Sequence, residues 1–403
     1  MGIIKILIIV QNLPVPFDRR VWMEATTLER ANYQVSIISP QKYNYTKSYE
    51  VIENVNVFRY PLLIEAHKSP LAFLCEFGTC FLFTSYLSLK ILLLKGFDII
   101  HICNPPDIYF PLAFIYKLFR KKIIFDHHDL SPEMYLAKNL HKKESSFFFK
   151  LLIILERLTF IVSDVIIATN ESHKTIAMTR GKKKESDIFV VRSGPNLSRF
   201  QNYHYDENLK NKKKYLVCYL GEMCEQDGVG EYLRQLDKYD RSFFEENVQM
   251  TFIGAGPDQI FMKNLAKNLN LDTFVNFTGR VSDSILANYL TTADLCFDTS
   301  PCNSWTDKST MNKIIEYMAF EKTIISFDLK ETKYSAGDAV VCIPKNNYNL
   351  FFKTMIELLI NVKERNVRSA IGKKRFEQKM SWVNSFPNLL HAYDAAICKT
   401  SNK

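Results

Sequence analysis

The chain has 403 residues, of which 47% are hydrophobic and 24% charged, and its formal net charge is +9. This length exceeds what one hydrophobic core usually serves, and the composition excludes disordered, collagen-like and low-complexity proteins. The positive charge favours anionic partners such as nucleotides, phosphates, nucleic acid or an acidic membrane leaflet, without choosing among them. We therefore expect a globular protein of two domains.

The N-terminal segment MGIIKILIIVQNLP has one lysine, a short apolar run and no small-residue cleavage site. This pattern favours a buried strand over a signal peptide. The nine cysteines contain no CxxC pair, and several lie in apolar runs such as 215–220. Such cysteines are typical of buried, reduced thiols, which predicts a cytosolic protein.

Short runs rich in Ile and Val alternate with helical stretches along the chain, and they predict parallel sheets that are covered on both faces. In the first half the expected strands are 5–10, 34–39, 98–103, 122–126, 165–169 and 188–191, and the expected helices include 18–32 and 111–119. After the basic segment 208–214, the expected strands are 215–220, 249–253, 274–277, 294–298, 323–327 and 339–343. Helical patterns at 346–378 and 382–396 close the chain. We predict an α/β protein with two doubly wound domains, 1–200 and 201–381.

Residues 71–94 approach the length of a membrane span, but Glu76 and Lys90 interrupt the apolar run. A mostly buried helix or helix pair is favoured, an interfacial membrane helix is the main alternative, and a true span is least favoured. A second apolar and aromatic stretch, 147–160, makes the two segments candidate contacts with an anionic membrane surface. The basic residues in this part of the sequence are Lys90, Lys95, Lys117, Arg120, Lys121, Lys142, Lys143 and Lys150.

The first strand runs into QNLPVPFDRR, where a dinucleotide-binding fold would have its G-x-G-x-x-G motif. The missing glycines count against an oxidoreductase. Asp18 is expected to cap the next helix, and Arg19 and Arg20 offer planar donors that an anion or a sugar can reach. The alternative is a capped helix with solvated arginines.

The strand at 122–126 leads into DHHDLSPE, which contains His127 and His128. Adjacent residues on an extended chain point to opposite sides, and no third nitrogen or sulfur ligand lies nearby in the sequence. One active-site histidine is therefore favoured over a metal site, with a structural histidine as the alternative. Ser131-Pro132-Glu133 is expected to open the next helix.

Three glycine-bearing loops directly follow strands of the second half. Their backbone N–H groups could cradle a nucleotide diphosphate, although each loop alone could also be an ordinary turn. The loops are Gly221-Glu222 with Gln226-Asp227-Gly228, then Gly254-Ala255-Gly256-Pro257, and then Gly279-Arg280.

The densest polar cluster is the segment DKSTMNKIIEYMA. Its spacing predicts a helix capped by Ser309 or Thr310, where an anion would meet free amides, the positive end of the helix dipole and Lys313. Glu316 could accept hydrogen bonds from a ribose or sugar hydroxyl, and Glu331, after the next strand, could reach the same site. The alternative is an amphipathic helix with a solvated lysine and glutamate.

Six fragments in order resemble bacterial family-4 glycosyltransferases, particularly the branch that builds cell-surface polysaccharides, O-antigens and lipopolysaccharide. The fragments are NLPVPFDRRVWMEA, DHHDLSPEMY, YLGEMCEQDGV, FIGAGP, FTGRV and DKSTMNKIIEYMAFEKTIISFDLKETKYSAGDA. The resemblance covers nearly the whole chain and is specific in this ordered combination. It implies the GT-B fold, with two facing Rossmann-like domains and a C-terminal helix, 382–403, that packs back on the first. It also implies a nucleotide sugar held mainly by the C-terminal domain, an acceptor held by the N-terminal domain, and a retaining transfer without a metal.

Within this resemblance, Glu316 matches the second acid of the family's two-glutamate motif, and His128 matches a histidine that lies against the donor sugar. The position of the first acid, eight residues before Glu316, is Lys308 here. The family's usual Arg and Lys after the first strand of the C-terminal domain are replaced by Glu222 or a neighbour and by Gln226 or Asp227. The candidates for balancing the phosphate charge are then Lys308, Lys313 and Arg280.

The sequence thus predicts a hexosyl- or N-acetylhexosaminyltransferase that moves a sugar from a nucleotide diphosphate, preferably a UDP-sugar, to a growing or polyprenyl-diphosphate-linked surface glycan. We expect no cofactor and no metal, a front-face substitution with inversion still open, and a cytoplasmic location on the inner face of the membrane. The alternatives are a catalytically inactive sugar-nucleotide-binding or membrane-scaffold protein and, on charge alone, a nucleic-acid-binding protein.

The expected catalytic residues are His128, Glu316 and Lys313. The expected donor-binding residues are Gly221, Glu222, Asp227, Gly228, Gly254, Gly256, Arg280, Lys308, Ser309, Thr310, Met311, Asn312 and Glu331. The expected acceptor-binding residues are Phe17, Asp18, Arg19, Arg20, His127, Asp129 and Glu133.

Overall fold

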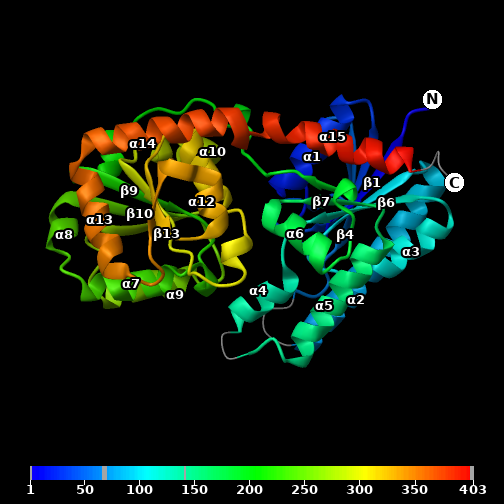
Figure 1. The fold of residues 1–403 in the computed structure, drawn as a ribbon, viewed down its shortest axis with the longest axis horizontal. Helices are drawn as coiled ribbons and strands as arrows, with labels where there is room; N and C mark the ends of the chain where they lie inside the picture. Colours follow the sequence, from blue (N-terminus) through cyan, green and yellow to red (C-terminus); the bar gives the residue numbers. More distant parts are fainter. Residues whose placement is uncertain (1, 66–69, 140–141, 400–403) are drawn as a thin grey trace. The chain divides into compact units, whose positions relative to one another are not determined.

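The computed structural model describes residues 2–65, 70–139 and 142–399 (Figure 1). It divides the chain into a first domain, Met1–Arg192 with Ser385–Lys403, and a second domain, Ser193–Asn384. The boundary lies before residue 200 because Phe200 packs in the apolar core of the second domain and Arg199 binds Glu316 there. The last residues of the expected C-terminal helix, 400–403, lie outside the described residues.

The first domain contains an eight-stranded sheet with the order β3-β4-β2-β1-β5-β6-β7-β8. Its strands are β1 (Lys5–Ile9), β2 (Gln34–Gln41), β3 (Tyr49–Ile52), β4 (Val55–Pro61), β5 (Ile99–Cys103), β6 (Lys122–His127), β7 (Val165–Ala168) and β8 (Ile188–Val190). Neighbouring strands are parallel except for β3 and β4, which form an antiparallel hairpin that the sequence analysis missed. Glu53 and Asn54 form its tight turn with positive φ angles of 46° and 64°.

Helices cover both faces of this sheet, and they include α1 (Arg19–Arg30), α2 (Pro70–Leu94), α3 (Phe110–Leu118), α4 (Ser131–Lys138), α5 (Phe147–Val162), α6 (Glu171–Thr179) and α15 (Trp382–Cys398). Side chains alternate along β5, as expected for a strand. Ile100 and Ile102 pack in the apolar core with residues of α2 and α3. His101 points the other way and bonds to Tyr393 of α15, with 2.7 Å between Nδ1 and the hydroxyl oxygen. The polar centre of the domain therefore lies on the α1 and α15 face.

The second domain contains a six-stranded parallel sheet with the order β11-β10-β9-β12-β13-β14. Its strands are β9 (Tyr215–Leu220), β10 (Val248–Ile253), β11 (Val275–Gly279), β12 (Leu295–Phe297), β13 (Ile324–Phe327) and β14 (Val340–Ile343). Apolar cores cover both faces, since Leu216 and Cys218 belong to one and Val217 and Tyr219 to the other. All six strands expected from the sequence are present, and helices connect them as in a doubly wound domain.

The helices of the second domain include α7 (Val229–Lys238), α8 (Ser242–Asn247), α9 (Gln259–Asn268), α10 (Asp283–Thr292), α11 (Asn312–Ala319), α12 (Lys330–Ala336), α13 (Tyr348–Ile360) and α14 (Val362–Arg375). The single helical stretch expected at 346–378 is broken at Asn361. There the Asn361 side chain accepts a hydrogen bond from the backbone N–H of Glu364, at 3.0 Å, and caps α14.

The expectation of a mostly buried helix at 71–94 is wrong. Residues Ala72–Leu94 of α2 form one continuous helix that is long and apolar enough to cross a membrane, yet only 22% of its most apolar window is buried inside the protein. Its exposed side chains are mostly leucines, with a phenylalanine, a tyrosine and the charged Lys90.

In each sheet the strand order reverses next to the first strand of the domain, at β1 and β5 in the first sheet and at β9 and β12 in the second. Ligands of doubly wound sheets bind outside the carboxyl ends of the strands at such reversals. These two edges are therefore where the functional side chains are expected.

Candidate active site

Arg20 is the centre of a buried ion cluster in the first domain. The side chain of Asp18 accepts a hydrogen bond from the N–H of Val21 and starts α1, which places Arg20 at the second helical position. The Arg20 guanidinium donates to both carboxylate oxygens of Asp126, at 2.8 and 3.1 Å, and to the carbonyl of Val191 at 2.8 Å. It also lies 3.1 Å from the carboxylate of Glu24. The expected cap is confirmed, whereas Arg20 is buried rather than solvated.

The two acids of this cluster have opposite pKa shifts. Burial favours protonation of Asp126, but the charges of Arg20 and His128 outweigh burial and hold its pKa well below the usual range. Burial raises the pKa of Glu24 well above the usual range despite the attraction of Arg20. Arg20 and Asp126 thus form the ion pair of the cluster, whereas burial favours the protonated form of Glu24.

His128 is the histidine of this cluster that reaches the surface. Its Nε2 forms a short hydrogen bond with Asp126, and 14% of its side chain is exposed. The amide oxygen of Asn104 accepts hydrogen bonds from the backbone N–H groups of His128 and Asp129, at 2.7 and 3.2 Å. His101, in contrast, is fully buried beneath Tyr393. The imidazole of His128 is thus fixed from its ring and from its backbone.

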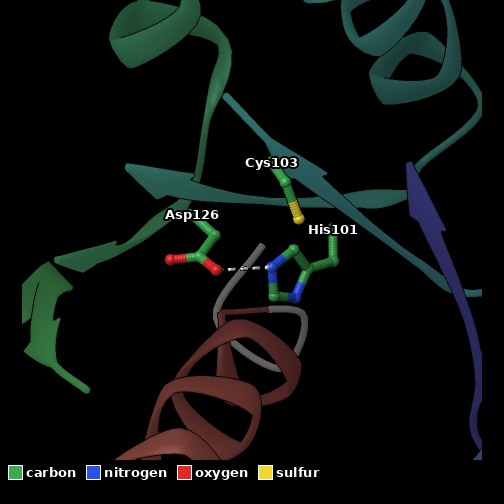
Figure 2. A group of neighbouring side chains, drawn as sticks. All are labelled: His101, Cys103 and Asp126. Carbon is green, nitrogen blue, oxygen red and sulfur yellow. Dashed lines mark ion pairs between the residues drawn. The ribbon is translucent and has the colours of Figure 1, made fainter. Parts of the chain in front are cut away.

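Two groups of side chains in this region have the spacing of metal ligands: His101, Cys103 and Asp126, and a second group of Glu24, Asp126 and His128. Figure 2 shows the first group, in which His101 from β5 lies 3.4 Å from the Asp126 carboxylate on β6. Arg20 already occupies both oxygens of Asp126 and would repel a cation. Burial also raises the pKa of the Cys103 thiol, which disfavours the thiolate that a metal requires. These residues therefore do not fit a metal ion.

His127 points away from His128, as adjacent residues of a strand do. It is fully buried, and its Nε2 lies 3.2 Å from Glu156. Burial and the charge of Arg180 lower the pKa of His127 to about 3, so it is neutral. Arg180 also binds Glu133 at 3.0 Å. His127 and Glu133, both expected to bind an acceptor, are therefore parts of an internal network.

The remaining residues expected at the acceptor site lie near the start of α1 and after β6. Phe17 is partly buried and stacks on Tyr43, with 4.6 Å between the ring centroids. Arg19 is exposed, and Asp129 is partly buried beside His128. Phe17, Arg19 and Asp129 thus remain accessible around the edge that carries His128.

Lys313 forms a buried ion cluster in the second domain. It is the second residue of α11, and its ammonium group donates to Asp298 at 3.0 Å and to the Tyr219 hydroxyl at 3.1 Å. Asp227 lies 3.9 Å away. Burial favours the neutral amine, but Asp298 and Asp227 outweigh burial and raise the pKa of Lys313. Its positive charge is therefore permanent and is matched inside the protein.

The start of α11 differs from the expectation. The helix begins at Asn312 after Met311, and no side chain caps it. Ser309 does not cap it because its hydroxyl donates to the carbonyl of Trp305 at 2.8 Å, and residues Thr306–Lys308 form a separate 3-10 turn. The first amide groups of α11 thus lie without a side-chain cap close to the carboxyl end of β12.

Glu316 lies one turn further along α11 and is buried against Arg199, to which it is bound. The Arg199 guanidinium also lies 4.2 Å from the centroid of the Phe200 ring and 3.9 Å from Asp283. Glu331, at the start of α12, is buried, in contrast to the exposed Arg280 that follows β11. Glu316 is therefore a fixed anion rather than a solvated surface residue.

The glycine loops meet at the carboxyl ends of β9, β10 and β11, as the topology predicts. The N–H of Gly254 donates to the carbonyl of Gly279 at 3.0 Å. A Cβ at Gly254 would lie 1.9 Å from the carbonyl oxygen of Gly221, and one at Gly256 would lie 2.4 Å from that of Met223. Close packing between these loops therefore accounts for glycine at 254 and 256. Gly228 precedes α7 with a positive φ of 78°.

Sequence reasoning missed several members of the two clusters. Asp126 and Asp298 end expected strands, and the rule that parallel sheets carry their sites at the carboxyl ends could have found both. Arg199, the partner of Glu316, lies within the range 1–200 that the sequence predicts for the first domain. Tyr393 has no local signal because it reaches the first domain from the far end of the chain.

Family models match both parts of the chain. Residues 18–199 match the model described as Glycosyltransferase Family 4, and residues 214–361 match the model described as Glycosyl transferases group 1. The chain belongs to the family-4 glycosyltransferases. An uncharacterized glycosyltransferase of Methanocaldococcus jannaschii is 23% identical over 372 residues, which cover 89% of this glycosyltransferase and 88% of the relative.

Solved structures share the fold of this glycosyltransferase. Sucrose-phosphate synthase from Thermosynechococcus elongatus has a TM-score of 0.76 at 14% identity and covers 99% of this chain and 100% of its own. Anabaena HepE in complex with UDP has a TM-score of 0.69 at 13% identity, and the match covers 97% of this chain and 100% of the HepE chain. HepE is also known in complex with UDP-glucose. The expected GT-B fold is confirmed: two α/β domains with parallel sheets and a C-terminal helix.

Proposed function

We propose that this glycosyltransferase moves a hexosyl or N-acetylhexosaminyl group from a UDP-sugar to a hydroxyl of a growing or polyprenyl-diphosphate-linked surface glycan. The observation that carries the proposal is His128, a partly exposed imidazole at the carboxyl end of β6 that a buried aspartate holds in place. The UDP-bound complexes of HepE, which has the same fold, support the choice of nucleotide. The surface-glycan acceptor rests on the ordered sequence fragments that resemble this branch of the family.

The second domain is assigned to the donor. The uncapped amides of α11 and the positive end of its dipole suit the charge that develops on the departing diphosphate. Lys313 adds little net charge, because Asp298 and Asp227 already match it. We therefore assign the direct cationic contacts to Lys308 and Arg280. This revises the expectation that Lys313 grips the phosphates.

Glu316 is assigned to the ribose of the donor, as expected from the sequence. Its carboxylate is held by Arg199 and is positioned to accept hydrogen bonds from hydroxyl groups. Changing Glu316 to Ala should raise the dissociation constant of the donor, whereas changing His128 to Ala should mainly lower turnover.

The first domain is assigned to the acceptor and the reacting sugar. His128 would lie against the donor sugar, with Phe17, Arg19 and Asp129 around the acceptor. Asp126 is unsuited to covalent attack because Arg20 and His128 engage its oxygens. We therefore propose a front-face substitution that retains the anomeric configuration. The bond from the anomeric carbon to the phosphate oxygen breaks, the bond to the acceptor oxygen forms on the same face, and the acceptor proton passes to the leaving phosphate.

The proposal is tested with purified full-length protein, a panel of nucleotide sugars and synthetic polyprenyl-diphosphate-linked acceptors. Mass spectrometry should detect a product that is one sugar heavier than the acceptor. NMR of this product should show that the transferred sugar keeps the anomeric configuration that it has in the donor, and EDTA should leave the rate unchanged. A product with the inverted anomeric configuration would refute the retaining mechanism. Loss of activity in EDTA would refute the claim that the transfer needs no metal.

The second candidate is an inactive protein that only binds sugar nucleotides, and Lys308 at the position of the family's first acid favours it. UDP-sugar binding without transfer or hydrolysis on the whole acceptor panel would support this alternative. Isothermal titration calorimetry also tests the donor site. Lys308→Ala and Arg280→Ala should each weaken UDP binding by about 1–3 kcal/mol, and Lys363→Ala on the exposed face of α14 serves as the control.

A further inference from the structure

The helix α2 carries an exposed apolar stripe along its whole length. Leu82, Tyr86, Leu89 and Leu93 recur at three- or four-residue spacing, and Leu74 lies eight residues before Leu82, so all five lie on one face. Between 51% and 77% of each of these side chains is exposed. A helix on a water-facing surface normally presents polar residues there.

The opposite face of α2 carries two buried hydroxyl groups. Cys80, Thr84, Ser88 and Ile91 are buried at the same spacing. The Thr84 hydroxyl lies 3.3 Å from the hydroxyl of Tyr109, and Ser88 lies 2.9 Å from that of Tyr116 in α3. The helix therefore points Thr84 and Ser88 into the protein and the leucines of the stripe outward, which reverses the pattern of a soluble surface helix.

The helices α3 and α5 continue this surface. Both belong to the crossovers that cover the same face of the sheet as α2, and α3 packs against α5. Their large exposed apolar side chains are Phe114, Ile115 and Leu118 of α3 and Phe147, Phe148, Ile154 and Ile161 of α5. We call the outer faces of α2, α3 and α5 the apolar face.

The charges on the apolar face have one sign. Among the described residues of the three helices, the exposed charged side chains are Lys90, Lys150 and Arg157. The exposed Lys142, Lys143 and Glu144 lie in the segment before α5, so this segment also carries a net positive charge. A second copy of this chain would bring like charges together across such a face, whereas an anionic lipid leaflet complements them.

The packing of α2 also decides between a surface contact and a span. Its hydroxyl groups are bonded to tyrosines of the same domain, and its buried stripe belongs to the domain's apolar core. A helix that crossed the bilayer would have to leave these contacts. An interfacial helix keeps them and inserts only its outer side chains between the headgroups.

We propose that the apolar face of the first domain docks on the anionic leaflet of a lipid bilayer, with the leucine stripe of α2 and the phenylalanines of α3 and α5 among the headgroups. This surface is independent of the proposed transfer reaction, because it involves none of the residues assigned to the donor or acceptor.

The test is co-sedimentation of the full-length protein with phosphatidylcholine vesicles, with or without 30% phosphatidylglycerol, across a salt series. The variant Leu82→Glu/Leu89→Glu/Leu93→Glu should reduce binding to anionic vesicles at least tenfold. The control is Ile260→Glu/Phe261→Glu on α9, where two similarly exposed apolar residues lie in the second domain, and it should bind as the wild type does. Reversing Lys90, Lys150 and Arg157 to Glu should remove the salt-sensitive part of binding.

A second measurement does not depend on disrupting the face. Tyr86→Trp should be quenched by brominated phospholipids in the vesicles, and Ile260→Trp should not. Equal binding of the leucine variant and the wild type, or no quenching at position 86, would overturn the proposal. Wild-type binding that does not depend on lipid charge and resists alkaline carbonate would also overturn it, because this behaviour indicates a transmembrane span. A protein that dimerises in solution and does not bind vesicles would overturn it too, because the apolar face would then bind a second copy of the chain.

Discussion

Each of the two domains holds a buried ion cluster at the carboxyl ends of its strands. Arg20 and Lys313 are each the second residue of a helix, and each binds an aspartate at the carboxyl end of a parallel strand, Asp126 in one domain and Asp298 in the other. Each cluster also contains a further acid whose pKa burial raises, Glu24 in the first and Asp227 in the second. The clusters therefore solve the same problem, which is to keep a buried cation neutralised beside a site.

They differ in what surrounds the aspartate. Asp126 also binds the partly exposed His128. In the second domain, Lys313 donates hydrogen bonds both to Asp298 and to the hydroxyl of Tyr219, which does not titrate near neutral pH. Burial raises the pKa of Tyr219 well above its usual range. The comparison teaches that the cluster of the first domain holds a partly exposed side chain in place, whereas that of the second domain stays inside the protein. The following predictions are ordered from the largest expected effect to the smallest.

The largest effect should follow removal of Asp126. Asp126→Ala leaves the guanidinium of Arg20 buried without its main partner, and we expect a loss of about 3–5 kcal/mol in the free energy of unfolding. Urea unfolding followed by circular dichroism measures it. The control is Glu357→Ala, which breaks an exposed 3.9 Å pair with Lys353 and should change stability by about 0.5 kcal/mol or less. Equal losses in the free energy of unfolding would mean that the Arg20 cluster stabilises the protein no more than an exposed ion pair does.

The two adjacent histidines should separate rate from stability. His128→Ala should lower turnover by roughly 100-fold or more with little change in melting temperature, because the imidazole is partly exposed at the site. His127→Ala should lower the melting temperature, because it leaves Glu156 and a cavity behind. Initial rates and thermal melts of both variants decide this, and a reversed pattern would exchange their roles.

The cluster of the second domain should be less sensitive than that of the first. Asp298→Ala removes the 3.0 Å partner of Lys313, but Tyr219 and Asp227 remain near the ammonium group. We expect a loss of about 2 kcal/mol in the free energy of unfolding, measured as for Asp126. A loss as large as that of Asp126→Ala would show that the two clusters are energetically equivalent.

The smallest effect should be a pH dependence in the first domain. Burial, and then the charge of Glu156, raise the pKa of Asp107 from 3.8 to about 7. The stability that this group contributes is therefore complete below about pH 4 and is lost as the pH rises to about 7. Asp107→Asn removes this titration while an amide keeps the contact with Ser131. The melting temperature of the variant relative to the wild type should rise from pH 4 to 7 and then stay level, and a constant difference would contradict the shift.

Most of the fold could be predicted because the strands of parallel sheets are buried on both faces. Short apolar runs such as 122–126 and 215–220 are typical of such strands. The hairpin of β3 and β4 escaped prediction because Tyr49–Ile52 is half exposed and lies at the sheet edge. At the site, alternation along the strand correctly placed His127 and His128 on opposite sides.

Other features of the site depend on tertiary contacts. Ser309 has the right residue type for a helix cap, yet the carbonyl of Trp305 takes its hydroxyl. Lys313 has the right position for a phosphate ligand, yet Asp298 neutralises it. Neither partner can be inferred from the spacing of the local sequence, since pairing depends on how the strand ends converge.

The bond between Tyr393 and His101 has a consequence for biosynthesis. During translation, residues 1–192 leave the ribosome first, but the helix that covers their polar centre is made only after the whole second domain. Until then the nascent first domain lacks the bond from Tyr393 to His101, so its polar centre is completed only when the end of the chain is made. A messenger truncated before codon 385 would therefore yield a protein with an intact second domain and an unfinished first one.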